Sequence, residues 1–242
     1  MLEIFKKEFN SFFNSLIGYM VIGIFLIVMG LIFWVYPETS VLDFGYANMD
    51  TLFNFCPFVF IFIIPAITMR LFAEEKKTGT LELLFTKPLK HYQIILGKFL
   101  SAVSVIIIAL LPTLIYYYSI SQLGSPIGNI DSARVIGSYL GLVLLASTFA
   151  SIGVFTSALT DNQIIAFILS VFINYVLYAG FDSLAGISSL SDQAYWIQQL
   201  GMSAHYDFMS RGLIDTREIM YFFSVVSLFL LFTNLIFTSK KW

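Results

Sequence analysis

The stretch LIGYMVIGIFLIVMGLIFWV, Leu16 to Val35, has no charged residue and is typical of a helix that crosses a membrane. A helix rises about 1.5 Å per residue, so a run of this length covers the roughly 30 Å hydrocarbon core of a bilayer. The run is longer than the apolar part of a cleavable signal peptide, and no A-x-A-like site follows it. We therefore expect it to remain in the mature protein as its first span.

The rest of the chain has the same character. Its mean hydropathy is +0.86, and only 12% of its residues are charged, too few to cover a soluble globule. Six segments are long and apolar enough to span a bilayer. They lie near residues 16–35, 53–72, 95–119, 135–159, 164–181 and 219–238. The sequence thus predicts an all-α polytopic membrane protein with six transmembrane helices, forming one domain over residues 1–242.

The distribution of basic residues predicts the orientation of the spans. Six spans place both termini on one side. If that side is cytoplasmic, ten of the 13 Lys and Arg residues lie inside, and only Arg134, Arg211 and Arg217 lie outside. Loops facing the cytoplasm carry an excess of Lys and Arg, so we expect both termini to be cytoplasmic. The net charge of −2 gives no indication of a nucleic-acid partner.

The segment before the first span, MLEIFKKEFNSFFNSL, places Phe5, Phe9 and Phe12 on one face of a helix and its charges between them. Residues 1–15 are therefore predicted to form an amphipathic interfacial helix on the cytoplasmic side, with the aromatic face among the lipid headgroups. The same helix could instead present a contact surface to a partner, and the sequence leaves both interpretations open.

The stretch AEEKKTGTLELLFTKPLK, Ala73 to Lys90, holds seven of the 28 charged residues. It is the only sizeable loop on the predicted cytoplasmic side, since the connection at residues 160–163 is too short to contribute much. Thr78 or Thr80 can cap a short helix that Pro88 ends. Its apolar face carries Leu81, Leu84 and Phe85. This helix is predicted to lie across the membrane surface, although an ordinary solvated connection would show the same charges.

Two motifs resemble a known family. MRLFAEEKKTGTLELLFTKPLKHYQIILGK, Met69 to Lys98, resembles the first cytoplasmic loop of ABC-2-type permeases: an acidic pair, a basic residue, Gly-Thr, an acidic residue, a Leu pair and a Pro. HYDFMSRGLIDTREIMYFFS, His205 to Ser224, is similar to a region of gliding-motility-associated permease subunits, the GldF group. The external positions that match are Arg211, Gly212, Asp215 and Arg217.

The resemblance implies a permease subunit whose short cytoplasmic helix is a coupling helix, seated in a groove of a separate ABC ATPase subunit. The chain has no G-x-x-x-x-G-K-[ST] phosphate loop, so we expect no enzyme activity of its own, with ATP and Mg bound by the partner. A second permease half, identical or different, and the inner membrane of a gliding bacterium are also implied. The residues expected to contact the ATPase are Glu74, Glu75, Gly79, Thr80, Leu81, Glu82, Leu84 and Phe85.

The interiors of the spans carry no ionisable side chain near their centres, which argues against a proton- or ion-coupled carrier. The polar residues there, Thr68, Asn174, Thr233 and Asn234, are expected to form hydrogen bonds between helices. Span four has small residues at four-residue spacing, which predicts close packing against a helix of this chain or of a second half. These residues are Gly137, Gly141, Ser147 and Ser151. The isolated His91 and His205 predict no metal site.

The external segment 182–218 contains DQAYWIQQLG, in which Tyr195, Trp196 and Leu200 are expected to point inward from a short helix. The segment would serve as a lid or as a periplasmic docking site. Two functions remain open: a transport permease, and a scaffold that passes ATPase-driven motion to a periplasmic or motility apparatus. A polar path between the spans would favour transport, and a sealed apolar interior would favour the scaffold.

Overall fold

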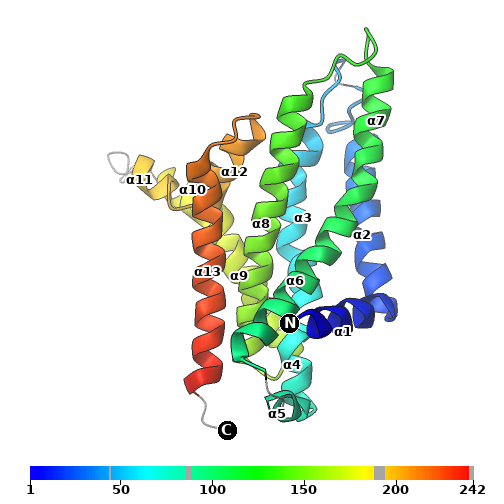
Figure 1. The fold of residues 1–242 in the computed structure, drawn as a ribbon. Coiled ribbons are helices and arrows are strands. Elements are labelled where there is room, and N and C mark those ends of the chain that lie inside the picture. The colour runs from blue at the N-terminus through cyan, green and yellow to red at the C-terminus, as the bar shows by residue number, and fades with distance from the viewer. Residues whose placement is uncertain (44, 86–88, 188–193, 240–242) are drawn as a thin grey trace.

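The computed structural model describes residues 1–43, 45–85, 89–187 and 194–239 and is an elongated bundle of helices, with no strand in those ranges (Figure 1). Six apolar segments long enough to cross a membrane confirm the predicted spans. In chain order they are α2 (Leu16–Trp34), α3 with α4 (Asp50–Thr68, Arg70–Lys77), α6 with α7 (His91–Leu110, Leu114–Leu123), α8 (Ser132–Leu159), α9 to α10 (Gln163–Tyr175, Phe181–Ala185) and α13 (Thr216–Ser239).

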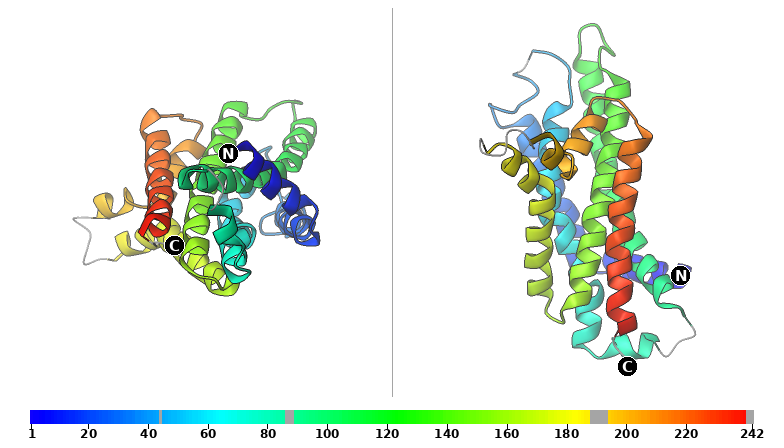
Figure 2. Two further views of the ribbon diagram at one scale, coloured as in Figure 1. Left: turned by 60° about the horizontal axis from the view of Figure 1, so that its bottom comes forward. Right: turned by 90° about the vertical axis from the view of Figure 1, so that its left-hand side faces the viewer.

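Four shorter helices lie at the two ends of the bundle. The helices α1 (Leu2–Phe13) and α5 (Thr80–Phe85) lie near one end, toward which α13 also runs (Figures 1 and 2). We call this the α5 end. At the opposite end, called the α12 end, lie α11 (Ala194–Gln198) and α12 (Met202–Ser210). Pro88, predicted to end the coupling helix, lies outside the described residues.

The helix α8 is the centre of the bundle and packs against α3, α6, α9, α12 and α13. Its small residues explain how closely α12 approaches it. A Cβ atom added at Gly137 would lie 2.8 Å from Met209 O, and one at Gly141 would lie 3.2 Å from Met209 Cβ. Ser151 is buried and Ser147 is half-buried. The glycines thus pack against a helix of this same chain, which answers the question that the spacing left open.

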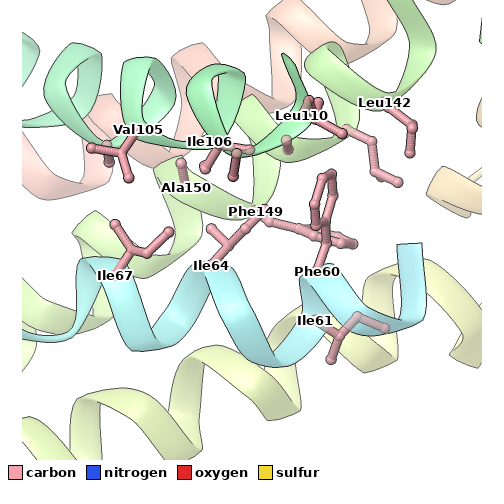
Figure 3. Close-up of a cluster of buried hydrophobic side chains, with 14 of the residues drawn as sticks. Phe60, Ile61, Ile64, Ile67, Val105, Ile106, Leu110, Leu142, Phe149 and Ala150 are labelled. Atoms are coloured by element: carbon pink, nitrogen blue, oxygen red, sulfur yellow. The ribbon is translucent and has the colours of Figure 1, made fainter. Parts of the chain in front are cut away.

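A closed apolar core joins α3, α6 and α8. Phe60 and Ile64 of α3 meet Ile106 of α6 and Phe149 of α8 in this core (Figure 3). Each of these four side chains is at most 2% exposed. Tyr206 of α12 ties the α12 end to α3 by donating a hydrogen bond to Phe53 O at 2.8 Å. Dispersion contacts of this density hold membrane helices together where no hydrophobic driving force exists between them.

Three spans are interrupted by local changes of helix geometry. Span two breaks at Met69, between α3 and α4. Span three contains a 3-10 turn at Leu111–Thr113, where Pro112 removes a backbone donor. Span five widens into a π-helix at Val176–Gly180. Such segments often mark functional positions inside membrane helices.

Two expectations about polar and aromatic residues are wrong. Thr68 and Thr233 donate hydrogen bonds to carbonyls of their own helices, Ile64 O and Phe229 O, and not across to a neighbour. Tyr195, Trp196 and Leu200 are 61–72% exposed and do not point inward, because α11 is only five residues long and stands away from the bundle. The helix α11 packs against α10, and these three side chains lie on its exposed side.

Candidate functional site at the α5 end

The helix α4 is the last part of span two and leads into α5. Leu71, Phe72 and Ala73 at its start are buried, whereas Glu74 and Lys77 are exposed. Ser157 of α8 fixes the start of α4: its Oγ accepts hydrogen bonds from the N–H groups of Phe72 and Ala73 at 3.0 and 3.1 Å and donates to Met69 O at 2.8 Å. A helix start leaves N–H groups unpaired, so Ser157 caps α4 from another span.

A turn then separates α4 from α5. Gly79 has a φ of +72°, in the left-handed region that favours glycine, and nothing within 4 Å would block a side chain there. Backbone geometry, therefore, is the reason for glycine in the Gly-Thr motif. Next to the turn, the hydroxyls of Thr78 and Thr80 lie 2.9 Å apart.

The helix α5 turns a different face outward from the one expected. Leu81 is 1% exposed and packs into the chain itself, so it anchors α5 and does not face the bilayer or a partner. Leu83, the first residue of the motif's Leu pair but not one of the expected contact residues, is 66% exposed. Thr80 and Glu82 are exposed, Leu84 is half-buried, and Phe85 ends the helix, its side chain lying outside the described part. The outward face is thus Thr80, Glu82 and Leu83.

Four charged side chains form a network that joins α1, α4 and α6. Lys98 of α6 is completely buried, and its Nζ donates to Glu8 Oε1 at 2.8 Å and to Leu71 O at 2.6 Å. The same Nζ lies 3.0 Å from Glu75 Oε2 and 5.1 Å from the centre of the Phe72 ring. A buried ammonium requires such partners, because an unpaired one would be strongly disfavoured.

Lys7 completes the network by pairing with Glu75 Oε1 at 3.0 Å. Burial tends to lower the pKa of Lys7, but the carboxylates of Glu75 and Glu8 outweigh it and raise the pKa above its ordinary value. Two ammonium groups and two carboxylates balance in charge. Glu75 was expected to contact the ATPase, yet its side chain is only 14% exposed and points into this network. Its neighbour Glu74 is the outward member of the acidic pair.

A cleft of about 380 Å³ lies between the α4–α5 turn and the connection from α8 to α9. Glu82 lines it from one side and Asp161 from the other, and Lys76 crosses beside it to hydrogen-bond Ala158 O. The expectation that residues 160–163 are too short to matter is therefore wrong. Both connections share one surface because α8 ends beside α4.

The amphipathic helix α1 is confirmed as a helix, and it lies across the bundle instead of along it (Figure 1). Its stripe is only partly available to lipid. Phe12 is 4% exposed, with the Arg70 guanidinium 5.1 Å from its ring centre, whereas Phe5 and Phe9 are half-buried and stacked 5.7 Å apart. Phe12 thus packs against protein, not among headgroups.

The second motif lies at the α12 end. His205 points one ring nitrogen at a Glu218 carboxylate oxygen and the other at Gln199 O, which is 2.9 Å away. Gly212 has a φ of +81°, and its Cβ position would lie 3.0 Å from Arg134 Cα. Both features are structural: they hold the turn after α12 against α8 and α13.

The other matching positions of this motif, Arg211, Asp215 and Arg217, lie on the surface of that turn, Asp215 being half-buried. The side chain of Asp215 accepts a hydrogen bond from the Arg217 N–H at 2.9 Å, as a capping residue does at the start of a helix. No group of three or more metal-ligating side chains gathers within the described ranges.

Comparison with known proteins agrees with this arrangement. A search of curated proteins found no match. The family model for ABC-2 family transporter proteins matches residues 2–240, nearly the whole chain. Six spans and a polar surface at one end of the bundle are the features expected of a permease. The chain therefore belongs to the ABC-2 family of transporter proteins.

Proposed function

We propose that this chain is one permease half of an ABC-2 transporter of the bacterial inner membrane, and that a separate ABC ATPase subunit binds the α5 end. The termini and α5 would then face the cytoplasm, as the basic residues predict. ATP and Mg bind to the partner, and hydrolysis of this ATP drives export or conformational work. The similarity of residues 205–224 to the GldF group suggests a link to gliding motility and a second membrane subunit.

One observation carries this proposal: the exposed α5 face is connected through α4 to spans two and three by packed and hydrogen-bonded contacts among the described residues. Leu81 anchors α5, Ser157 fixes the start of α4, and the Lys98 network ties α4 to α6 and α1. A partner that moves α5 would therefore move spans two and three together. Contiguous packed and hydrogen-bonded elements of this kind are what carry coupling between distant sites.

The exposed chemistry of the surface suggests how the ATPase is held. Glu82 and Asp161 line the cleft, and Glu74 lies on the outer side of α4, so basic side chains on the partner would find acidic ones here. Leu83 adds an exposed apolar contact beside them. An apolar anchor flanked by charges is the usual composition of a protein interface.

A scaffold that moves no solute is the second candidate. The apolar core of Phe60, Ile64, Ile106 and Phe149 favours it, because buried apolar side chains fill the space where α3, α6 and α8 meet (Figure 3). In that case the ATPase binds the same surface at the α5 end, and its motion is transmitted through the bundle to the α12 end. The two candidates differ in whether water reaches the interior of the bundle.

The test is ATP hydrolysis by the complex in lipid nanodiscs, purified through a tag on this chain. Glu82→Lys should reduce both ATPase recovery and turnover, since it reverses the charge of the outward face. Glu38→Lys, the same change on an exposed residue at the α12 end, is the matched control and should leave both unchanged. Full recovery and turnover with Glu82→Lys would disprove the assignment of α5.

A further inference from the structure

The inward face of α9 carries a row of polar residues inside the membrane. The residues of span five that are fully buried recur at every fourth position, at Ala166, Ser170, Asn174 and Tyr178. Asp182 follows at the same spacing, at the α12 end of the span. Side chains four apart form one ridge on a helix, so these residues make a continuous line from the α12 end into the bundle.

Several buried polar atoms in this row lack hydrogen-bond partners, although the other carboxylate oxygen of Asp182 accepts a hydrogen bond from Ser203. Both side-chain atoms of Asn174, the hydroxyl of Ser170 and one carboxylate oxygen of Asp182 are buried without a partner. Asn174 stands at the midpoint of the span Gln163–Ala185, where the bilayer offers no donor or acceptor. Burying a polar group without a hydrogen bond costs free energy, so a row of them in one line requires a reason.

The helix that carries the row is also the least regular in the bundle. The π-helix at Val176–Gly180 interrupts it between Asn174 and Asp182. Only 22% of the apolar segment of this span is buried, against 72% of that of α8. Its opposite face exposes apolar side chains such as Ile168 and Phe172. Span five thus packs mainly against α3 and α8, along the polar row, with smaller contacts to α4 and α12.

We propose that the inward face of span five, from Asp182 of α10 to Ser170 of α9, is a water-accessible surface that contacts a hydrophilic cargo during the transport cycle. This inference rests on the proposed transport function and adds the class of the cargo: a polar solute, in contact with hydroxyl and amide groups. Hydroxyl and amide side chains supply donors and acceptors without a charge and suit neutral polar groups. A lipid would instead require an apolar surface.

Accessibility of single cysteines in membrane vesicles tests this inference. Ser170→Cys and Asn174→Cys are made in a Cys56→Ala background, because Cys56 is the only native cysteine. The vesicles are treated with a charged methanethiosulfonate reagent, which reacts with thiols in contact with water. The controls are Phe172→Cys, on the lipid face of the same helix, and Ile64→Cys, in the closed core. Each variant is measured without nucleotide, with ATP, and with ATP and vanadate.

We expect Ser170→Cys and Asn174→Cys to react at least about tenfold faster than both controls in one or more of these conditions. Rates no faster than Ile64→Cys in every condition would overturn the proposal. The outcome is separable from that of the proposed function. Fast labelling of a chain that co-purifies with no ATPase would support the polar surface and contradict the proposed ATPase partner. ATP hydrolysis by the complex without labelling would support the ATPase partner and favour the scaffold.

A second measurement uses the wild-type chain and avoids any folding defect of the variants. Hydroxyl radicals generated by radiolysis oxidise tyrosines that touch water. Tyr178 of the row and Tyr206 of α12 are 6% and 1% exposed, so geometry alone predicts little oxidation of either. A hydrated row predicts that Tyr178 is oxidised several-fold faster than Tyr206. Equal rates would contradict hydration of the row.

Discussion

Lys98 Nζ lies 3.0 Å from Glu75 Oε2, although the two residues belong to different spans and α5 lies between them along the chain. The ammonium is completely buried, and the carboxylate is only 14% exposed. This contact connects α6 with α4 on either side of the surface where we place the ATPase. Its strength therefore decides whether a movement of α5 reaches both spans or one.

Replacing Lys98 by Met should lower the free energy of unfolding by about 3–5 kcal/mol, because Glu8 and Glu75 would remain buried without their main partner. The measurement is unfolding by titration with a denaturing detergent. Lys6→Met is the control, since Lys6 pairs with Glu3 at 3.6 Å on the surface and should contribute at most about 1 kcal/mol. The triple variant with Glu8→Gln and Glu75→Gln should recover most of the loss. A Lys98→Met protein as stable as wild type would contradict the network.

Leu81 and Leu83 provide a matched pair on α5 that separates anchoring from binding. Leu81→Ala should cost about 2–5 kcal/mol of stability, as expected for a buried leucine, whereas Leu83→Ala should change it by less than about 0.5 kcal/mol. Conversely, Leu83→Asp should reduce the amount of ATPase that co-purifies and leave unfolding unchanged. If Leu83→Asp left ATPase recovery intact, the outward face would have been misassigned.

The sequence was sufficient for the spans because hydropathy is a local property. Each segment, such as Leu16 to Val35, must span the hydrocarbon core and pair its backbone hydrogen-bonding groups within its own helix. Its length and composition therefore predict it without knowledge of its neighbours. The helical character of residues 2–13 was predictable for the same reason, since its period is local. Both are confirmed.

The site was less predictable because its geometry depends on contacts between spans. Nothing near Glu75 in the sequence shows that it turns inward, since its partner Lys98 lies in the next span. A lysine just inside an apolar run was the available signal, as such a residue requires a buried counter-charge. Leu81 and Leu83 are alike in the sequence, and only the packing of α5 separates them. The buried polar atoms of Ser170 and Asn174 that lack hydrogen-bond partners can likewise be recognised only once α9 is packed against α3 and α8.

Gly153 and Thr68 make the tightest contact between α8 and α3. A Cβ atom added at Gly153 would lie 1.9 Å from Thr68 Oγ1 and 2.8 Å from Thr68 Cβ. Gly153→Ala should therefore separate the two helices and destabilise the protein by about 1–3 kcal/mol. Gly23→Ala on α2 is the control, as nothing lies within 4 Å of its Cβ position. The double variant with Thr68→Ala should recover part of the loss. Equal stability of the two glycine variants would refute close packing here.

The pair of His205 and Glu218 should hold α12 to α13 through a side-chain hydrogen bond. One ring nitrogen of His205 faces the Glu218 carboxylate, and the other lies 2.9 Å from Gln199 O. A double-mutant cycle with His205→Phe and Glu218→Leu should give a coupling energy of about 1.5–3 kcal/mol. The matched cycle uses Arg134 and Asp50 at the same end, an exposed pair at 2.9 Å that should give at most about 1 kcal/mol. Coupling in the first cycle no larger than in the second would show that this hydrogen bond contributes little, and that the stack of His205 on Tyr221, with centroids 3.7 Å apart, holds the motif instead.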